Sequence, residues 1–75
     1  MPKLGILSGR EVCRILERHG FRNVRQRGSH VVMQKKTAGS TITVPVPMHP
    51  EIRTGTLMAV IRQSGIARRA FEKSG

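Results

Sequence analysis

The amino-acid sequence predicts a single α+β domain over residues 1–75, with the element order helix, strand, strand, strand, helix. Apolar residues recur at intervals of three and four near both ends of the chain, which is typical of amphipathic helices. Between them lie three shorter stretches separated by glycine-containing segments, and the last stretch alternates strictly between apolar and polar residues. We therefore expect a three-stranded antiparallel sheet with both helices on one face and the other face open.

The first helix is predicted to begin after Ser8, because Ser8 and Glu11 have the spacing of a capping box. A stripe of residues at helical spacing follows: Val12, Ile15, Leu16 and His19. Gly20 is expected to end the helix as a C′ glycine. Cys13, the only cysteine of the chain, falls inside this pattern, and we expect it to be a small, unreactive core residue.

A β-hairpin is predicted next. Its first strand begins with Phe21 and Val24, residues 27–29 form the turn, and residues 30–34 form the second strand. Gly28 is expected to permit the turn and a close approach of the backbone.

The third strand is predicted over residues 41–46, after a polar loop at residues 35–39. Its apolar residues face inward: Ile42, Val44 and Val46. Pro45 lies within this strand and has no N–H to donate, so the strand is expected at an edge of the sheet.

The second helix is predicted to open at Thr54 after a connector over residues 47–50. One helical face carries the inward residues: Leu57, Val60, Ile61 and Ser64. Gly65 ends the helix, and a short final turn around residues 67–72 is expected to pack Phe71 on the core.

The chain is strongly basic, with fourteen lysines and arginines against four glutamates, no aspartate and a net charge of +10. Such a charge predicts a polyanionic partner: a nucleic acid, an anionic membrane surface or an acidic protein. The scarcity of carboxylates argues against a two-metal phosphoryl-transfer site, which needs several of them clustered. No group of cysteines and histidines has zinc-site spacing, so we expect neither a metal nor another cofactor.

The chain has no apolar run of the length of a membrane span and no apolar core of a secretion signal near its first residue. We therefore expect a cytoplasmic protein with no membrane partner.

Two phenylalanines with no tryptophan or tyrosine leave no aromatic platform for stacking single-stranded bases. RNA recognition would then use arginine and lysine on the backbone. The predicted element order is also that of double-stranded-RNA-binding domains, which favours RNA by analogy. A DNA-binding regulator is less favoured, because a hairpin stands where a helix-turn-helix needs its recognition helix.

Three histidines are candidates for proton transfer, since histidine is the side chain that titrates nearest neutrality. His19 falls in the last helical turn, where a capping role is expected. His49 lies in the proline-rich connector. His30 opens the second strand, and period-two alternation places Val31 and Met33 in the core and His30 on the open face.

On that face His30 is expected beside Thr41 or Thr43 if the strands pair in register. Four cations flank it in the sequence: Arg25, Arg27, Lys35 and Lys36. These residues alone leave two alternatives open, a catalytic histidine or an ordinary surface histidine.

The sequence resembles the HicA family of small toxins from bacterial toxin–antitoxin systems over nearly its whole length. The resemblance is carried by "LSGREV", "HGF", "RQRGSH", "TVPVPMH" and "GTLMAVIRQSGI", in this order. It implies a double-stranded-RNA-binding-like fold and an mRNA interferase, an enzyme that cleaves mRNA. It also implies that His30, which follows the Gly-Ser pair, is catalytic. Family members often carry a further aromatic residue or histidine after this element, where this chain has Val31 and Val32.

The resemblance further implies a HicB-type antitoxin that binds the toxin and blocks its site, with oligomers formed only through that complex. In a metal-independent mechanism His30 would act as general base or acid, and His49 and Ser29 are candidate helpers. Arg25, Arg27, Lys35 and Lys36 would bind RNA and stabilise charge on the phosphate. The alternative is a non-catalytic RNA-binding module with the same fold.

Overall fold

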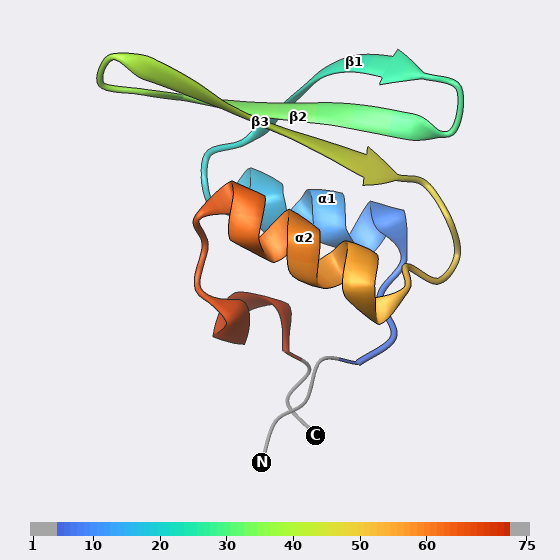
Figure 1. Cartoon of the computed structure of the whole chain (residues 1–75). Helices are drawn as coiled ribbons and strands as arrows, with labels where there is room; N and C mark the ends of the chain where they lie inside the picture. Colours follow the sequence, from blue (N-terminus) through green and yellow to red (C-terminus); the bar gives the residue numbers. More distant parts are fainter. Residues whose placement is uncertain (1–4, 73–75) are drawn as a thin grey trace.

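The computed structural model describes residues 5–72 of the chain. Its elements follow the predicted order (Figure 1): α1 (Gly9–Arg18), β1 (Arg22–Arg27), β2 (His30–Thr37), β3 (Ser40–Pro47), α2 (Thr54–Ser64) and a short 3₁₀ helix, η1 (Arg68–Phe71). The sheet forms one layer, and both helices lie against the same face of it. The predicted α+β class, with an open sheet face opposite the helices, is confirmed.

Both predicted ends of α1 are confirmed. The backbone N–H of Glu11 donates to Ser8 Oγ (3.1 Å), and the Glu11 carboxylate accepts from the Ser8 N–H (3.0 Å), which completes the capping box. At the other end Gly20 has φ of 94° and its N–H donates to the Glu17 carbonyl, while the Phe21 N–H donates to the Leu16 carbonyl. These two hydrogen bonds form a Schellman motif, and Phe21 is the buried residue that accompanies it.

The sheet is an antiparallel meander with the strand order β1-β2-β3. Gly28 and Ser29 form the two-residue loop between β1 and β2, and Gly28 has φ of 56°, the left-handed value that a tight hairpin of this kind requires at its first position. Phe21 lies just before β1, and Val24 is exposed at a bulge between Asn23 and Arg25. Here the predicted apolar start of the first strand is wrong for Val24, because the bulge interrupts the alternation.

The second strand is longer than its sequence predicts. β2 continues to Thr37, and the loop to β3 shrinks to Ala38 and Gly39, where Gly39 has φ of 97°. The expected polar loop over residues 35–39 is therefore wrong for its first three residues. Their side chains are polar, but pairing with β3 supplies their backbone hydrogen bonds.

The core lies between the sheet and the helices, and among residues 5–72 it contains thirteen buried apolar residues. Val31 and Met33 of β2 and Val44 and Val46 of β3 face it, as the alternation predicts, while Pro45 points outward. In the described part of the chain β3 pairs only with β2, so Pro45 lies on an edge strand as expected. The predicted core face of α2 is confirmed by its buried residues: Leu57, Val60, Ile61 and Ser64.

The C-terminal predictions also hold. Gly65 adopts φ of 73° at the end of α2, and Phe71 of η1 is 1% exposed. The buried Ser64 hydroxyl donates to the Ile61 carbonyl (2.8 Å) and accepts from the Ile66 N–H (3.1 Å), so this polar side chain is satisfied inside the core.

Candidate functional site

Three segments of the chain meet at one corner of the molecule, where the β1–β2 turn, the end of β3 and the β3–α2 connector lie together. The Met48 N–H donates to the Ser29 carbonyl (2.6 Å), which ties the connector to the hairpin turn. The first residue of β2, His30, pairs with the last residue of β3, Pro47. The turn and the connector are thus held in a fixed relation by backbone contacts.

Gly9 fixes the connector from the side of α1. Its N–H donates to the His49 carbonyl (3.0 Å), and the residue is buried. A Cβ at Gly9 would overlap the Pro47 carbonyl oxygen and would lie 2.8 Å from the Cα of Met48, whereas unbonded carbon atoms pack at about 3.5–4.0 Å. Only glycine allows this approach, so Gly9 fixes the backbone path of the connector that carries His49.

The sequence reasoning did not single out Gly9. The available signal was a glycine at the first position of a capped helix, where a better helix former is ordinarily expected. The reason for this glycine is a close contact with residues 47–49, which are distant in the sequence.

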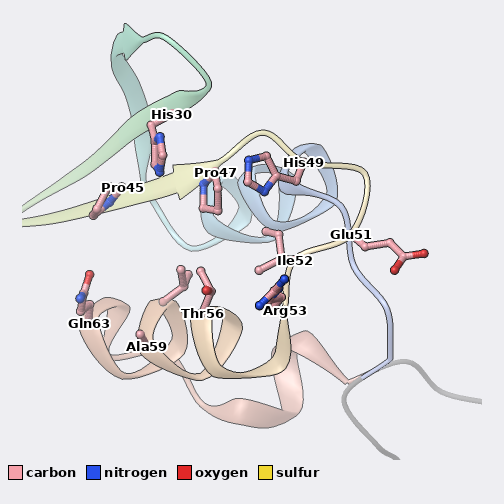
Figure 2. A pocket seen from close by; sticks show the side chains of 11 residues that line it. His30, Pro45, Pro47, His49, Glu51, Ile52, Arg53, Thr56, Ala59 and Gln63 are labelled. Atoms are coloured by element: carbon pink, nitrogen blue, oxygen red, sulfur yellow. The ribbon is translucent and has the colours of Figure 1, made fainter.

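This corner borders a cavity of about 380 Å³ between the end of the sheet and α2, which we call the histidine cavity. Its lining comes from the strands (His30, Pro45, Pro47), from the connector (His49, Glu51, Ile52, Arg53) and from α2 (Thr56, Ala59, Val60, Gln63). Figure 2 shows the His30 side chain at the start of β2 and His49 on the connector, with Pro47 at the end of β3 between them. The volume lies in the lower part of the range of about 300–1,000 Å³ that is common for small-molecule sites.

The polar groups of the histidine cavity suit acid–base work on an anion. His30 and His49 are exposed imidazoles that both line it, and Arg53 at the start of α2 adds a permanent positive charge. Thr56 and Gln63 add a hydroxyl and an amide from α2. Figure 2 shows the Glu51 carboxylate directed away from the imidazoles. The cavity can therefore hold a phosphate group and move protons to and from its oxygens.

The neighbours of His30 differ from those expected. His30 lies opposite Pro47, whereas Thr43 pairs with Gln34 and Thr41 pairs with Lys36. The two-residue loop at Ala38 and Gly39 sets this register, so both threonines lie farther along the sheet. The expectation that His30 stands beside Thr41 or Thr43 is wrong.

Lys35 and Lys36 are also not neighbours of His30. They lie five and six residues along the same strand, at about 3.3 Å per residue, which places their Cα atoms roughly 17–20 Å from that of His30. The Lys35 ammonium stands 6.0 Å from the centre of the buried Phe21 ring. Arg25 and Arg27 remain close to the hairpin turn, but they border a different hollow on the open face of the sheet.

The remaining candidate histidine, His19, and the cysteine, Cys13, lie outside the histidine cavity. His19 ends α1, and its Nδ1 lies 2.9 Å from the Ile15 carbonyl, in agreement with the predicted capping role. Cys13 is partly buried against the core. Burial raises the pKa of the Cys13 thiol, and the nearby Glu17 carboxylate raises this pKa further.

Within residues 5–72, no three histidine, cysteine or acidic side chains are grouped as metal ligands. No helix in this range is long and apolar enough to cross a membrane.

A comparison with protein families matches residues 9–66 to the model of the HicA toxin of bacterial toxin–antitoxin systems. The match runs from the first residue of α1 to just past the end of α2 and includes both histidines of the cavity. No curated protein matches the chain. Because the family model covers more than half of the chain, this protein belongs to the HicA toxin family and is the toxin of a toxin–antitoxin system.

Proposed function

We propose that this toxin is a metal-independent endoribonuclease that cleaves mRNA in the histidine cavity, and that a HicB-type antitoxin inhibits it by covering this cavity. Membership of the HicA toxin family supports a toxin with an antitoxin partner. The observation that carries the proposal is the presence of His30, His49 and Arg53 around one cavity.

Metal-independent cleavage of RNA uses the ribose 2′-hydroxyl as the nucleophile. A neutral imidazole takes the proton of this hydroxyl while its oxygen forms a bond to the adjacent phosphorus. The bond from phosphorus to the 5′-oxygen breaks, and a protonated imidazole gives its proton to that leaving oxygen. The products are a 2′,3′-cyclic phosphate and a 5′-hydroxyl, and no electron transfer takes place. The reaction therefore needs two proton-transfer groups, and His30 and His49 are a matching pair.

The phosphate gains negative charge in the transition state, which a fixed cation stabilises. Arg53 lines the histidine cavity and takes the role that the sequence had assigned to Lys35 and Lys36. Ser29 contributes through its backbone, since its carbonyl accepts from Met48, and Gly28 supports the turn that presents His30.

The rival function is an RNA-binding module without catalysis, because the basic charge and the fold serve both. The presence of two imidazoles around one cavity favours cleavage, since binding of phosphate alone requires only cations and hydrogen-bond donors, whereas cleavage requires groups that transfer protons.

The first test is His30→Ala. We expect this variant to fold normally, because His30 is exposed and starts a strand, and to lose about 10²–10⁴-fold in the rate of RNA cleavage. Cleavage of a labelled RNA by purified protein in excess chelator measures this, and the 2′,3′-cyclic phosphate ends of the products identify the reaction.

The matched control is His19→Ala, which removes an exposed histidine outside the histidine cavity. It is expected to cleave at the parent rate and to arrest growth on expression. Undiminished cleavage by His30→Ala would exclude the assignment of His30. Binding of intact RNA by the parent protein without cleavage would favour the RNA-binding module.

A further inference from the structure

The open face of the sheet carries a second hollow, of about 460 Å³, which no step of the proposed cleavage uses. We call it the open-face hollow; its lining residues are Val24, Arg25, Arg27, Val32, Gln34 and Thr43. They come from all three strands, so the hollow extends across the sheet. Val32, Gln34 and Thr43 alternate along their strands with residues that are buried against the helices, so the hollow lies on the face away from both helices.

All the charged side chains of the sheet are positively charged. The sequence holds no acidic residue between Glu17 and Glu51, a span that includes the whole sheet. The charged side chains of the three strands are all cations: Arg22, Arg25, Arg27, Lys35 and Lys36. An anionic ligand is therefore attracted to the sheet without opposition from carboxylates on it.

The open-face hollow also has an apolar floor and a polar rim. Val24 is 51% exposed and Val32 is half-buried, so both present methyl groups to a ligand. Beside them, Gln34 Nε2 donates to Thr43 Oγ1 (3.3 Å). This bond orients the Gln34 amide and leaves its carbonyl oxygen and its second N–H free to meet a partner. Cations, methyl groups and an oriented amide together match the phosphate, the face and the edge of a nucleotide.

The hollow adjoins the histidine cavity. Arg27 pairs directly with His30 across β1 and β2, and Val32 lies two residues beyond His30 on β2, about 7 Å along the strand. One short RNA strand can therefore contact both places.

We propose that the open-face hollow binds an unpaired nucleotide of the RNA substrate next to the cleavage point and that it sets base preference. Arg25 and Arg27 bind the phosphates, Val24 and Val32 contact the face of the base, and the Gln34–Thr43 pair reads its edge. This inference rests on the proposed ribonuclease function and adds a specificity site to it.

The test measures binding of oligo(A), oligo(C) and oligo(U) to protein that carries His30→Ala, so that RNA stays intact. Arg25→Gln is expected to weaken binding of all three about threefold to tenfold and to flatten the salt dependence, because it removes a phosphate contact. Gln34→Leu is expected to reduce the difference in affinity between the three RNAs about fivefold or more, since it removes the edge contacts.

Matched controls lie on the same strands outside the hollow. Arg22→Gln removes a cation of β1, and Thr41→Val removes a hydroxyl of β3; both residues are exposed. Both controls are expected to bind the three RNAs within about twofold of the His30→Ala parent. If Arg22→Gln weakens binding as much as Arg25→Gln does, RNA is held by the general positive charge of the protein and not by this hollow, and the proposal is wrong.

Two further outcomes would also overturn it. One is an unchanged base preference in Gln34→Leu. The other is unchanged RNA binding by Arg25→Gln together with weakened binding of the antitoxin, which would identify the hollow as a protein interface. A separate experiment tests the proposed ribonuclease function itself. If RNA stays intact after incubation with protein that retains His30, that function is wrong, whatever the binding measurements show.

Discussion

His30 and His49 reach the histidine cavity from backbones that are held in different ways. His30 is paired on both sides, with Arg27 of β1 and with Pro47 of β3, so the sheet fixes its position. His49 lies in the connector, where its carbonyl accepts one hydrogen bond from Gly9. The geometry of this histidine pair therefore depends on the sheet for one member and on α1 for the other.

The proposed pair of proton carriers makes a prediction for His49→Ala. We expect its rate of RNA cleavage to fall about 10²–10⁴-fold and one limb of the bell-shaped pH dependence of kcat/KM to disappear, because one proton-transfer group is lost. Initial rates over a pH series measure both effects. A uniform loss at every pH, with the bell shape intact, would mean that His49 positions RNA and transfers no proton.

The raised pKa of Cys13 predicts that its thiol reacts slowly with alkylating reagents. Because burial and Glu17 raise its pKa, the thiol stays protonated to a higher pH in the folded chain than in the unfolded chain. Alkylation by iodoacetamide at mildly alkaline pH is expected to be several-fold slower for folded protein than for protein in urea. Equal rates in the two states would contradict this.

The raised pKa of Cys13 also makes the free energy of unfolding depend on pH. A group whose pKa is raised by folding contributes stability below its unfolded pKa, about 8.5 for a thiol, and this contribution is lost as the pH rises further. Replacement of Cys13 by alanine should therefore reduce the fall in the free energy of unfolding on the alkaline side.

At the scale of elements, the start of α1 has two tasks. The capping box of Ser8 and Glu11 satisfies backbone donors at the helix end, and Gly9 lets the connector approach. The other side of the histidine cavity is bordered by an edge strand whose last residues include Pro45 and Pro47. Proline presents no N–H at a sheet edge, so this part of β3 is a poor template for another strand.

Gly9→Ala separates these two tasks. Alanine ordinarily stabilises a helix by about 1 kcal/mol relative to glycine, but here its Cβ meets Pro47 and Met48. We expect a net loss of about 1–3 kcal/mol from overpacking together with a fall in kcat, because the segment that carries His49 must move. Thermal denaturation and cleavage rates measure the two effects.

The matched control is Ser8→Ala, one residue earlier. It removes the cap and is expected to cost about 1 kcal/mol, with kcat unchanged at a temperature where the variant is folded. If Gly9→Ala loses stability but retains the parent kcat, Gly9 is structural and does not position His49.

At the scale of the whole molecule, the net charge of +10 works against folding and in favour of binding. Like charges repel one another in the folded chain, while an RNA strand replaces its counterions with arginine and lysine. The charged side chains of the strands include no carboxylate, and Arg25 and Arg27 line the hollow on the open face, so this face is the side that we propose for RNA.

Added salt should therefore raise the thermal stability of the protein and lower its affinity for RNA. Raising sodium chloride from low to physiological concentration is expected to raise Tm by a few degrees, since screening weakens the repulsion. The same change is expected to weaken RNA binding by the His30→Ala variant, with a log–log slope of about −0.7 for each phosphate contact. A Tm that falls with added chloride would contradict the first part, and an RNA affinity independent of salt would contradict the second.

Local patterns in the sequence determined most of the fold. The capping box, the glycine stops and the alternation at residues 41–46 depend on neighbours within a few positions, so the ends of α1, the inward residues of β3 and the core face of α2 were predictable. The same alternation placed Val31 and Met33 in the core. His30 was identified as a candidate from the sequence through these patterns and the family resemblance.

The composition of the site was decided by the tertiary structure. The β2–β3 register moved Thr41 and Thr43 away from His30, and the connector brought His49 and Arg53 to the same cavity. The need for glycine at position 9 arises from a contact with residues about forty positions away. Such contacts depend on strand register and loop path, which follow from packing of the whole chain rather than from any short run of residues.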